Sequence, residues 1–344
     1  MKGSFYLGDR KFAVRELSNL TPQEGEVRIR VAACGVCGTD VHIYHGGKGS
    51  AEVSPPVVLG HEFSGVVEEI GPGVDIVAVG DRVTVDPNLY CGKCHYCQSG
   101  KKQLCTGLRA YGVNENGGFA QACVVKQEQC YKLSPTIPLK YGAMAEPLAC
   151  AIHGVDQAKI RQGDTVCVLG GGAMGLIMVQ LAKMAGASLV MLSEPVSLRR
   201  EVGLKVGADA AVDPIQEDLP ARVKELTGLD GVDVVIECVG NRIAMDQAFQ
   251  VCKRGTTVLL FAVHPVDEGS EISPFDIYNK ELTIVGSMIN PDTHGRAVAL
   301  INSGRLQLEP LLTHSFPIVE LEQAILTQMG RESIKVLVEP ADDE

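Results

Sequence analysis

The chain has 344 residues, of which 45% are hydrophobic, and its formal net charge at pH 7 is −11. This length predicts two domains, or one large domain with an insertion, and the apolar content excludes a disordered chain. The acidic balance, without any block of basic residues, excludes nucleic acid and anionic membranes as partners.

The first residues and the cysteines indicate the compartment. Residues 1–6 lack the apolar segment of a signal peptide, and no apolar run reaches the length of a membrane span. We therefore expect a cytoplasmic protein in which the twelve cysteines are reduced. In a reducing compartment, a cluster of cysteines indicates a metal site before it indicates disulfides.

The first third of the chain is predicted to consist of short strands. Residues 26–31 alternate charged and apolar side chains at period two, which is typical of a half-buried strand. Further strands bounded by turn residues are predicted at 57–59, 65–71 and 80–85. This pattern predicts a partly open domain that resembles a β-barrel.

The segment from Cys37 to Glu62 contains a thiol, an imidazole and carboxylates, which are the types of side chain that bind zinc. A catalytic zinc takes three protein ligands from thiolate, imidazole and carboxylate groups and keeps one position open. Cys37 and His61 are the first two candidates, and the third is either Glu62 or Glu146. Asp40 is a candidate to accept the spare N–H of His61 and fix its tautomer.

A second cluster follows, at Cys91, Cys94, Cys97 and Cys105. Four thiolates at such close spacing would close a tetrahedral site with no open position, which is a structural zinc. The residues between them are mostly polar, so this loop cannot bury a core of its own and the metal would supply its folding energy. An iron–sulfur cluster is the alternative.

Glu146 lies in a predicted helix at 143–151, where its neighbours are apolar. An isolated buried carboxylate is costly unless it is paired or bound to a metal. This setting separates Glu146 from the solvated acids of the chain.

The pattern changes near residue 163. A continuous apolar run at 165–169, typical of a strand buried on both faces, leads into glycines at Gly170, Gly172 and Gly175. A predicted helix follows at 176–185, then a strand at 189–193 that ends in Glu194. This order is the dinucleotide-binding fingerprint, in which the glycines admit the pyrophosphate and the acid binds the ribose hydroxyls.

The alternation of strands and helices continues to residue 287. Strands are predicted at 232–236, 257–261 and 282–285, and helices near 198–206, 220–227 and 244–252. The fold class is therefore α/β, with a doubly wound parallel sheet after a β-rich domain. A helix at 294–303 and a closing strand at 333–338 are predicted to return to the first domain.

Together these motifs resemble the zinc-dependent medium-chain alcohol and polyol dehydrogenases over nearly the whole chain. The resemblance implies a GroES-like catalytic domain at 1–149, a Rossmann NAD-binding domain at 150–287, and a return to the catalytic domain at 288–344. It implies one catalytic and one structural zinc per chain and a homodimer or homotetramer. The matching segments are residues 37–42, 60–62, 80–83, 91–105, 170–175 and 333–335.

The resemblance also implies roles for single residues. Thr39 would take the proton of the substrate hydroxyl and pass it through the cofactor ribose to His42 at the surface. Lys335 would contact the cofactor phosphate, although a solvated lysine at a strand end fits the same position. Whichever of Glu62 and Glu146 is not a zinc ligand would remain beside the metal and accept a hydrogen bond from the substrate.

The implied reaction is oxidation of a secondary alcohol to a ketone, with hydride transfer to the cofactor. Glu194 predicts NAD⁺ rather than NADP⁺, because its carboxylate would repel a 2′-phosphate. Arg199, which we place in the cofactor site, and Arg200 lie close in sequence and would soften this preference.

A polyol, sugar alcohol or sugar acid is the expected substrate. Sorbitol dehydrogenases resemble the chain at Glu146, but they carry an Arg-Tyr pair where this chain has Ile289 and Asn290. L-Threonine 3-dehydrogenase, which the segment 37–44 also resembles, and a simple secondary-alcohol dehydrogenase are the alternatives within the enzymes. A non-catalytic nucleotide-binding protein is the third class.

Overall fold

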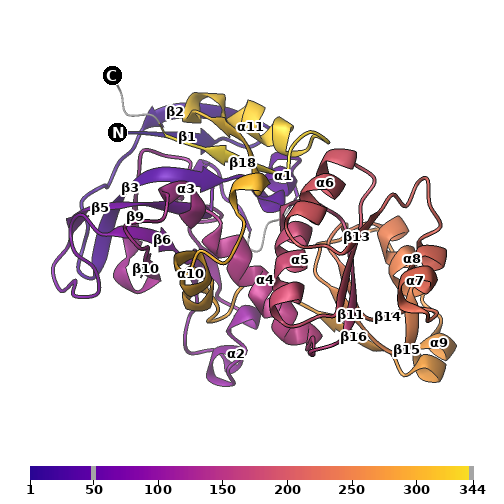
Figure 1. Ribbon diagram of the computed structural model, residues 1–344. Coiled ribbons are helices and arrows are strands. Elements are labelled where there is room, and N and C mark those ends of the chain that lie inside the picture. Colours follow the sequence, from indigo (N-terminus) through magenta and orange to yellow (C-terminus); the bar gives the residue numbers. More distant parts are fainter. Residues whose placement is uncertain (48–51, 341–344) are drawn as a thin grey trace. The chain divides into compact units, whose positions relative to one another are not determined.

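The computed structural model describes residues 1–47 and 52–340 (Figure 1). The chain forms two compact units. The first, unit 1, contains residues 1–149 and 291–344, and the second, unit 2, contains residues 150–290. Helix α4 (Ala145–Ala158) begins in unit 1 and ends in unit 2.

Unit 2 is built on a six-stranded parallel sheet with the order β13-β12-β11-β14-β15-β16. This is the order of the doubly wound dinucleotide-binding fold, in which the first strand lies at the centre and the chain crosses to the other side after the third. The strands are β11 (Thr165–Leu169), β12 (Leu189–Ser193), β13 (Ala210–Val212), β14 (Val232–Glu237), β15 (Cys252–Leu260) and β16 (Thr283–Gly286).

Helices cover both faces of this sheet (Figure 1). Side chains alternate between the faces of a strand, so Cys167 and Leu169 of β11 pack with Leu219 and Val223 of α7 on one face. The other face packs on α5 and α6, which contact β11, β12 and β13. The helices are α5 (Ala173–Met184), α6 (Ser197–Lys205), α7 (Leu219–Thr227), α8 (Arg242–Gln250) and α9 (Pro274–Lys280).

Unit 1 is organised around a seven-stranded sheet in which β10, β6, β5, β3, β18 and β17 lie side by side, while β9 also pairs with β3. A three-stranded sheet β2-β1-β4 and the pair β7-β8 complete it. The strands are β1 (Lys2–Tyr6), β2 (Phe12–Glu16), β3 (Glu26–Gly35), β4 (Val57–Val58), β5 (Glu62–Ile70), β6 (Arg82–Val85), β7 (Asn88–Leu89), β8 (Arg109–Ala110), β9 (Ala122–Lys126), β10 (Cys130–Lys132), β17 (Leu312–Phe316) and β18 (Lys335–Val338).

The helices of unit 1 are short and lie around these sheets. They are α1 (Gly38–Tyr44), α2 (His95–Gln98), α3 (Leu139–Gly142), α10 (His294–Asn302), α11 (Leu321–Gln328), with 3₁₀ turns η1 (Lys102–Leu104), η2 (Gln127–Gln129), η3 (Glu309–Leu311) and η4 (Ile318–Glu320). Every helix within the described ranges is too short or too polar to cross a bilayer.

The predicted fold class is confirmed: a β-rich unit is combined with a doubly wound parallel sheet. Strand β18 begins 300 residues after the end of β3 in the sequence. The two strands nevertheless pair antiparallel, with Leu337 opposite Gly35. This pairing brings the last strand of the chain beside the first metal-binding segment, because β3 leads directly into Cys37.

Candidate active site

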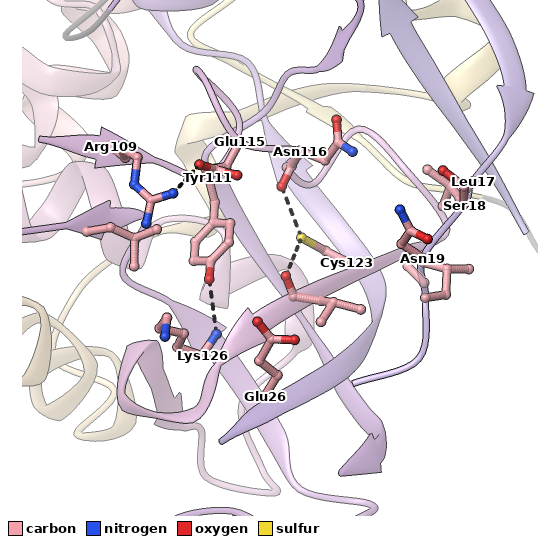
Figure 2. A pocket seen from close by; sticks show the side chains of 15 residues that line it. Leu17, Ser18, Asn19, Glu26, Arg109, Tyr111, Glu115, Asn116, Cys123 and Lys126 are labelled. Atoms are coloured by element: carbon pink, nitrogen blue, oxygen red, sulfur yellow. Dashed lines mark hydrogen bonds and ion pairs between the residues drawn. The ribbon is translucent and has the colours of Figure 1, made fainter. Parts of the chain in front are cut away.

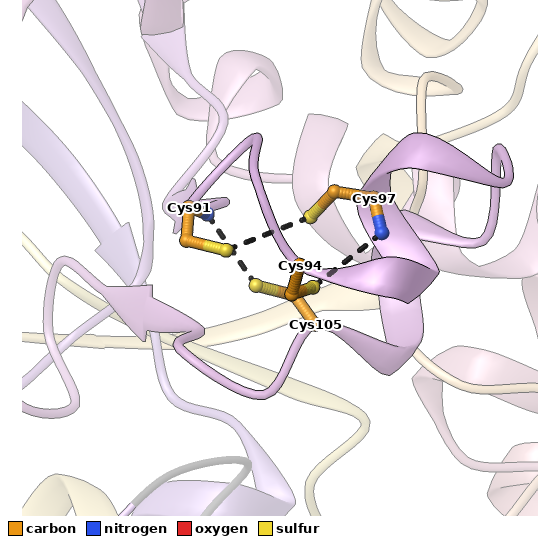
Figure 3. A group of neighbouring side chains, drawn as sticks. All are labelled: Cys91, Cys94, Cys97 and Cys105. Carbon is orange, nitrogen blue, oxygen red and sulfur yellow. Dashed lines mark hydrogen bonds between the residues drawn. The ribbon is translucent and has the colours of Figure 1, made fainter.

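The four clustered cysteines turn their sulfur atoms toward a common centre (Figure 3). All four Sγ atoms lie within 4.8 Å of one another, and those of Cys91 and Cys97 are 4.0 Å apart. Four thiolates at about 2.3 Å from a zinc ion would be spaced in this range. The set is therefore complete for a tetrahedral ion and leaves no position for a substrate.

Backbone N–H groups prepare this cluster for a cation. The N–H of Cys97 donates to Cys94 Sγ at 3.5 Å, and the N–H of Cys91 donates to Cys105 Sγ at 3.3 Å. Donation from Cys97 and then Thr106 lowers the pKa of Cys94 to about 6. Burial and the neighbouring Cys94 raise the pKa of Cys97 to about 12. A bound cation would release the remaining protons, because metal ligation requires thiolates.

The second cluster, in unit 1, joins half-buried Cys37 with buried His61 and Glu62, and each has a ligand atom within 4.8 Å of the others. Cys37 precedes α1, and its backbone N–H donates to the Asp40 carboxylate at 2.8 Å. His61 and Glu62 come at the start of β5. A helix start and a strand start therefore fix the donors on rigid elements.

Asp40 is completely buried behind His61, with its Oδ1 3.8 Å from the Nδ1 of the ring. This distance is longer than a hydrogen bond, and both atoms are buried without another hydrogen-bond partner. The prediction that Asp40 accepts the N–H of His61 is therefore not met in this structure, although the two groups face each other.

Lys335 is buried in this cluster, with a side-chain exposure of 4%. Its ammonium forms an ion pair with Glu62 and donates to the Val36 carbonyl at 3.0 Å. A Cβ atom at Gly35 would overlap with the Glu62 carboxylate, so only glycine leaves room for the pair. The expectation of a solvated strand-end lysine is wrong, because the ammonium is buried against Glu62, while the contact of Lys335 with a cofactor phosphate stays a prediction.

The charges of this cluster favour a cation. Burial lowers the pKa of His61, but the charges of Cys37, Asp40 and Glu146 outweigh it and raise that pKa well above its usual range. Burial likewise opposes the charge of Lys335, and the acids Glu62, Cys37 and Glu146 raise its pKa. The cluster thus stabilises positive charge, and its donor set of thiol, imidazole and carboxylate fits zinc.

The remaining predicted residues of this region lie on two helices. Glu146 is in the first turn of α4 with 7% exposure, which agrees with the apolar setting predicted for it. Thr39 is half-buried and His42 is exposed, and both lie on α1. Residues three apart occupy the same side of a helix, so the two side chains lie on one side of α1.

In unit 2, the glycine motif forms a cradle that side chains would fill. Gly170 directly follows β11 and has a φ of 97°, which favours glycine. A Cβ atom at Gly175 would overlap with the Gly170 carbonyl oxygen. Gly172 has open space where a side chain would project, at the N-terminus of α5. The loop therefore fits a pyrophosphate approaching that helix end.

Glu194 is buried at the end of β12 and faces this loop. Its Oε2 accepts from the N–H of Gly171 at 2.6 Å and its Oε1 from the N–H of Val196 at 2.8 Å. Arg199, on α6, lies beside the loop, since a Cβ at Gly171 would be 3.2 Å from the Arg199 Cβ. Arg200 donates to the Glu194 carbonyl at 2.8 Å and pairs with Asp213 at 3.1 Å.

Comparison with known proteins decides the family. The alcohol dehydrogenase GroES-like domain matches residues 23–135, and the zinc-binding dehydrogenase domain matches residues 173–303. The chain is 36% identical to 2-dehydro-3-deoxy-L-galactonate 5-dehydrogenase of Pseudoalteromonas atlantica, covering 97% of both chains.

The chain belongs to the zinc-dependent medium-chain alcohol and polyol dehydrogenase family. This dehydrogenase is also 37% identical to L-threonine 3-dehydrogenase of Pyrococcus horikoshii, over 86% of this chain and 85% of that protein. A zinc-binding dehydrogenase from Sinorhizobium meliloti bound to NADP has the same fold, with a TM-score of 0.94 and 40% identity over 98% of this chain and 99% of that one. The resemblance seen in the sequence is confirmed, and with it the use of zinc and a nicotinamide cofactor.

Neither Gly35 nor the pairing of Lys335 with Glu62 was predicted for this dehydrogenase. A glycine inside a strand marks a position where another group approaches closely, and that signal was present at the end of β3. That Lys335 is one of the groups that approach Gly35 could not be predicted, because it belongs to a strand 300 residues later in the sequence.

Another hollow of the dehydrogenase, of about 300 Å³, lies in unit 1 and contains none of the predicted site residues (Figure 2). Its polar groups contact each other. Arg109 pairs with Glu115 at 2.7 Å, and Tyr111 accepts from the N–H of Lys126 at 3.1 Å. Cys123 donates to the Asn116 carbonyl at 3.4 Å. We assign no ligand to it.

Proposed function

We propose that this dehydrogenase oxidises a secondary hydroxyl of a polyol or sugar acid to a ketone, with NAD⁺ as the acceptor. The observation that carries the proposal is the cluster of Cys37, His61 and Glu62, which offers thiol, imidazole and carboxylate donors within 4.8 Å of one another, with the charge of Glu146 acting on His61. A protein that only binds nucleotides would have no need for buried acids beside a thiol and an imidazole, because burying them is costly.

We infer that Cys37, His61 and Glu146 hold the catalytic zinc and that Glu62 stays paired with Lys335. Moving Glu62 onto the metal would leave the buried ammonium of Lys335 without its carboxylate, which is strongly unfavourable. When bound, the zinc supplies Lewis-acid polarisation of the substrate hydroxyl, while the nicotinamide accepts the hydride. As Thr39 Oγ1 accepts the hydroxyl proton, it gives up its own hydroxyl proton toward His42, which is exposed and exchanges it with solvent.

The preference for NAD⁺ rests on the end of β12. Glu194 presents a carboxylate where the adenosine ribose is bound in this fold, and a 2′-phosphate would be repelled there. Arg200 already forms an ion pair with Asp213, so we do not expect its guanidinium to bind a 2′-phosphate. The NADP-bound structure from Sinorhizobium meliloti favours the other cofactor, and the experiment below therefore includes both.

The substrate class follows from the second carboxylate beside the metal. If Glu146 is the zinc ligand, Glu62 and Lys335 form a further buried pair of charges beside it, which favours a substrate with more than one polar group. The relative that acts on a deoxygalactonate supports a sugar acid. The second candidate, threonine oxidation, is favoured by the 37% identity to a threonine dehydrogenase.

A homo-oligomer is proposed from unit 2. Strand β16 is at the edge of the parallel sheet, so it has one side open for pairing with a second copy. Exposed apolar side chains gather in the preceding segment, where Phe275 is 68% and Tyr278 83% exposed. Such residues are typical of a surface that is covered in the assembled protein.

The decisive experiment measures reduction of NAD⁺ and of NADP⁺ with matched substrates. These are a tetritol, a sugar acid, 2,3-butanediol, 2-butanol and L-threonine, and zinc is counted by mass spectrometry. We expect two zincs per chain, a higher kcat/KM with NAD⁺, and a loss of at least ~10²-fold on 2-butanol, because a buried polar group would be left unpaired. Activity on L-threonine alone would favour the second candidate, and binding of a dinucleotide without any turnover would contradict both.

A further inference from the structure

Glu237 is a fully buried carboxylate that the proposed reaction does not use. It is the last residue of β14, the strand beside β11, and it lies opposite Leu169 in the sheet. The residue after Leu169 is Gly170, where the dinucleotide loop begins. Glu237 therefore lies at the carboxyl edge of the sheet, at the point where the strand order switches sides and dinucleotides bind.

Glu237 ties together two segments that follow neighbouring strands. Its Oε1 accepts from the N–H groups of Val239 at 2.6 Å and Gly240 at 2.8 Å. Its backbone carbonyl accepts from the N–H groups of Phe261 and Ala262, each at 3.1 Å, which come directly after β15. The turn after β14 and the segment after β15 are thus fixed to the same residue.

The other carboxylate oxygen of Glu237 is held by His264. The distance between Glu237 Oε2 and His264 Nε2 is 3.0 Å, and the histidine side chain is only 20% exposed. Because a buried carboxylate oxygen needs a partner, His264 completes the hydrogen bonding of Glu237. Among the described hydrogen bonds, the pair adds a third anchor to the segment 261–264, whose first two N–H groups bond to the Glu237 carbonyl.

The anchored segments form one wall with the glycine loop. A Cβ atom at Gly170 would lie 2.8 Å from Val239 Cγ2, and one at Gly240 would lie 2.7 Å from the Val263 carbonyl oxygen. Two apolar side chains of this wall face solvent, Val239 at 46% and Val263 at 74% exposure. They offer an apolar surface beside the crevice where a dinucleotide binds.

We propose that His264 is a positioning residue for the nicotinamide half of the cofactor. In this fold each half of the sheet binds one mononucleotide, and the glycine loop with Glu194 lies on the half formed by β11, β12 and β13. The wall at Val239 and Val263 follows β14 and β15, on the other half. His264 acts through Glu237 to hold this wall in place. The inference rests on the proposed function, since it requires a nicotinamide dinucleotide.

The test compares two ligands that share the adenosine half, NADH and ADP-ribose, by calorimetry on the full-length protein. His264→Ala is expected to weaken NADH binding by ~10-fold, about the effect of losing one buried hydrogen bond. The same variant should bind ADP-ribose within about twofold of wild type. His264→Gln, whose amide nitrogen can donate to Glu237, should restore most of the affinity for NADH.

Glu268→Ala is the matched control. Glu268 lies in the same loop and accepts from the N–H of Arg242 at 3.0 Å, but it does not contact Glu237 among the described hydrogen bonds. It should leave both affinities unchanged. If His264→Ala does not fold, His264→Asn is measured in its place, because its shorter side chain keeps a polar group but does not reach Glu237.

The outcomes separate the inference from the proposed function. Equal loss of NADH and ADP-ribose, or no loss of either, would overturn the positioning role while wild type still binds both ligands. An equal effect of Glu268→Ala on NADH would also overturn it, because any loosening of the loop would then be sufficient. Wild-type protein that binds neither ligand would overturn the proposed function and this inference together.

Discussion

The two metal-binding clusters of unit 1 use similar donors in opposite surroundings. The four-cysteine cluster lies in a loop whose helix α2 has no buried residue, and three of its cysteines are half-buried. The cluster around Cys37 is enclosed, with Asp40, Glu62 and Lys335 exposed by no more than 3%. The loop of the four-cysteine cluster is polar and depends on an ion to hold it together. The side chains of the Cys37 cluster are already held in place by the folded protein.

This difference separates folding from reactivity. Four thiolates satisfy a zinc ion completely, so the ion can only hold the loop. Around the Cys37 cluster there are three carboxylates, of Asp40, Glu62 and Glu146, and a buried ammonium besides the thiol and the imidazole, so charge is balanced among several groups. An open coordination position with charged neighbours is what a reaction requires, and it is costly for stability.

The largest expected effect is on turnover, from Cys37→Ser. Losing the thiolate should remove the catalytic zinc and lower kcat by at least ~10³-fold, because Lewis-acid stabilisation is worth several kcal/mol and each tenfold in rate is about 1.4 kcal/mol. The melting temperature should change by less than about 5 °C, since the surroundings of Cys37 are held by other contacts. Steady-state kinetics, zinc analysis and thermal unfolding check this.

His45→Ala is the control for that variant, because His45 is exposed at the end of the same helix α1. It should retain two zincs and full activity. If Cys37→Ser unfolded the protein while keeping its zinc content, the assignment of the two clusters would have to be reversed.

The next effect is on stability, from Cys94→Ser in the other cluster. Without a closed thiolate set the loop loses the ion that supplies its folding energy, and the melting temperature should fall by about 10 °C. Dialysis against a chelator should reproduce this fall in wild type. His95→Ala, at the exposed residue beside Cys94, should change neither the melting temperature nor the zinc content. A stable Cys94→Ser variant with two zincs would contradict a structural role.

Periodicity was sufficient to predict the fold class in advance. The run at 165–169 is continuous because β11 is central and its residues 166–169 are fully buried. The glycine motif was readable because close packing at Gly175 and the positive φ of Gly170 each exclude other residues. Short elements such as β13 and α9 were not predicted, because a few residues carry too little periodicity.

The charge arrangement of the site was harder to predict, because it depends on pairings distant in sequence. A lysine is usually exposed at the surface, so the sequence alone does not predict that Lys335 is buried. Its ammonium reaches Glu62 because β18 pairs with β3. The hydrogen bond of His264 to Glu237 has the same origin, since it joins segments after two different strands. Spacing along the chain predicts ligands of one loop well and partners across a sheet poorly.

A finer test concerns the two glutamates of the Cys37 cluster. Glu146→Gln should lower the zinc affinity of this cluster by ~10²-fold. Loss of a ligand should weaken zinc binding at least as much as loss of a residue that only hydrogen-bonds to a ligand. Glu62→Gln should keep the zinc but lower stability, because Lys335 would be left buried without its carboxylate. Zinc titration of each purified variant measures the difference. The opposite ranking would make Glu62 the ligand and Glu146 the charge beside it.

The smallest expected effect comes from His294, a buried residue outside both metal-binding clusters. Its titration contributes to the pH dependence of stability and has to be separated from that of the two clusters. His294 of α10 is completely buried beside Tyr131, with a ring distance of 4.8 Å, and neither ring nitrogen has a hydrogen-bond partner. Burial lowers the pKa of His294 to about 3. The unfolded chain protonates this ring near pH 6.5, so it binds more protons than the folded protein below that pH.

Stability from His294 is therefore fully present above pH 6.5 and is lost as the pH falls toward 3. The loss should approach about 1.4 kcal/mol per pH unit between these limits, because one proton is bound on unfolding. His294→Phe keeps a ring against Tyr131 and removes the titration, so its stability should fall less steeply than that of wild type in urea unfolding at pH 6.5 and pH 5. Parallel losses in both proteins would mean that the acid sensitivity of stability does not come from His294.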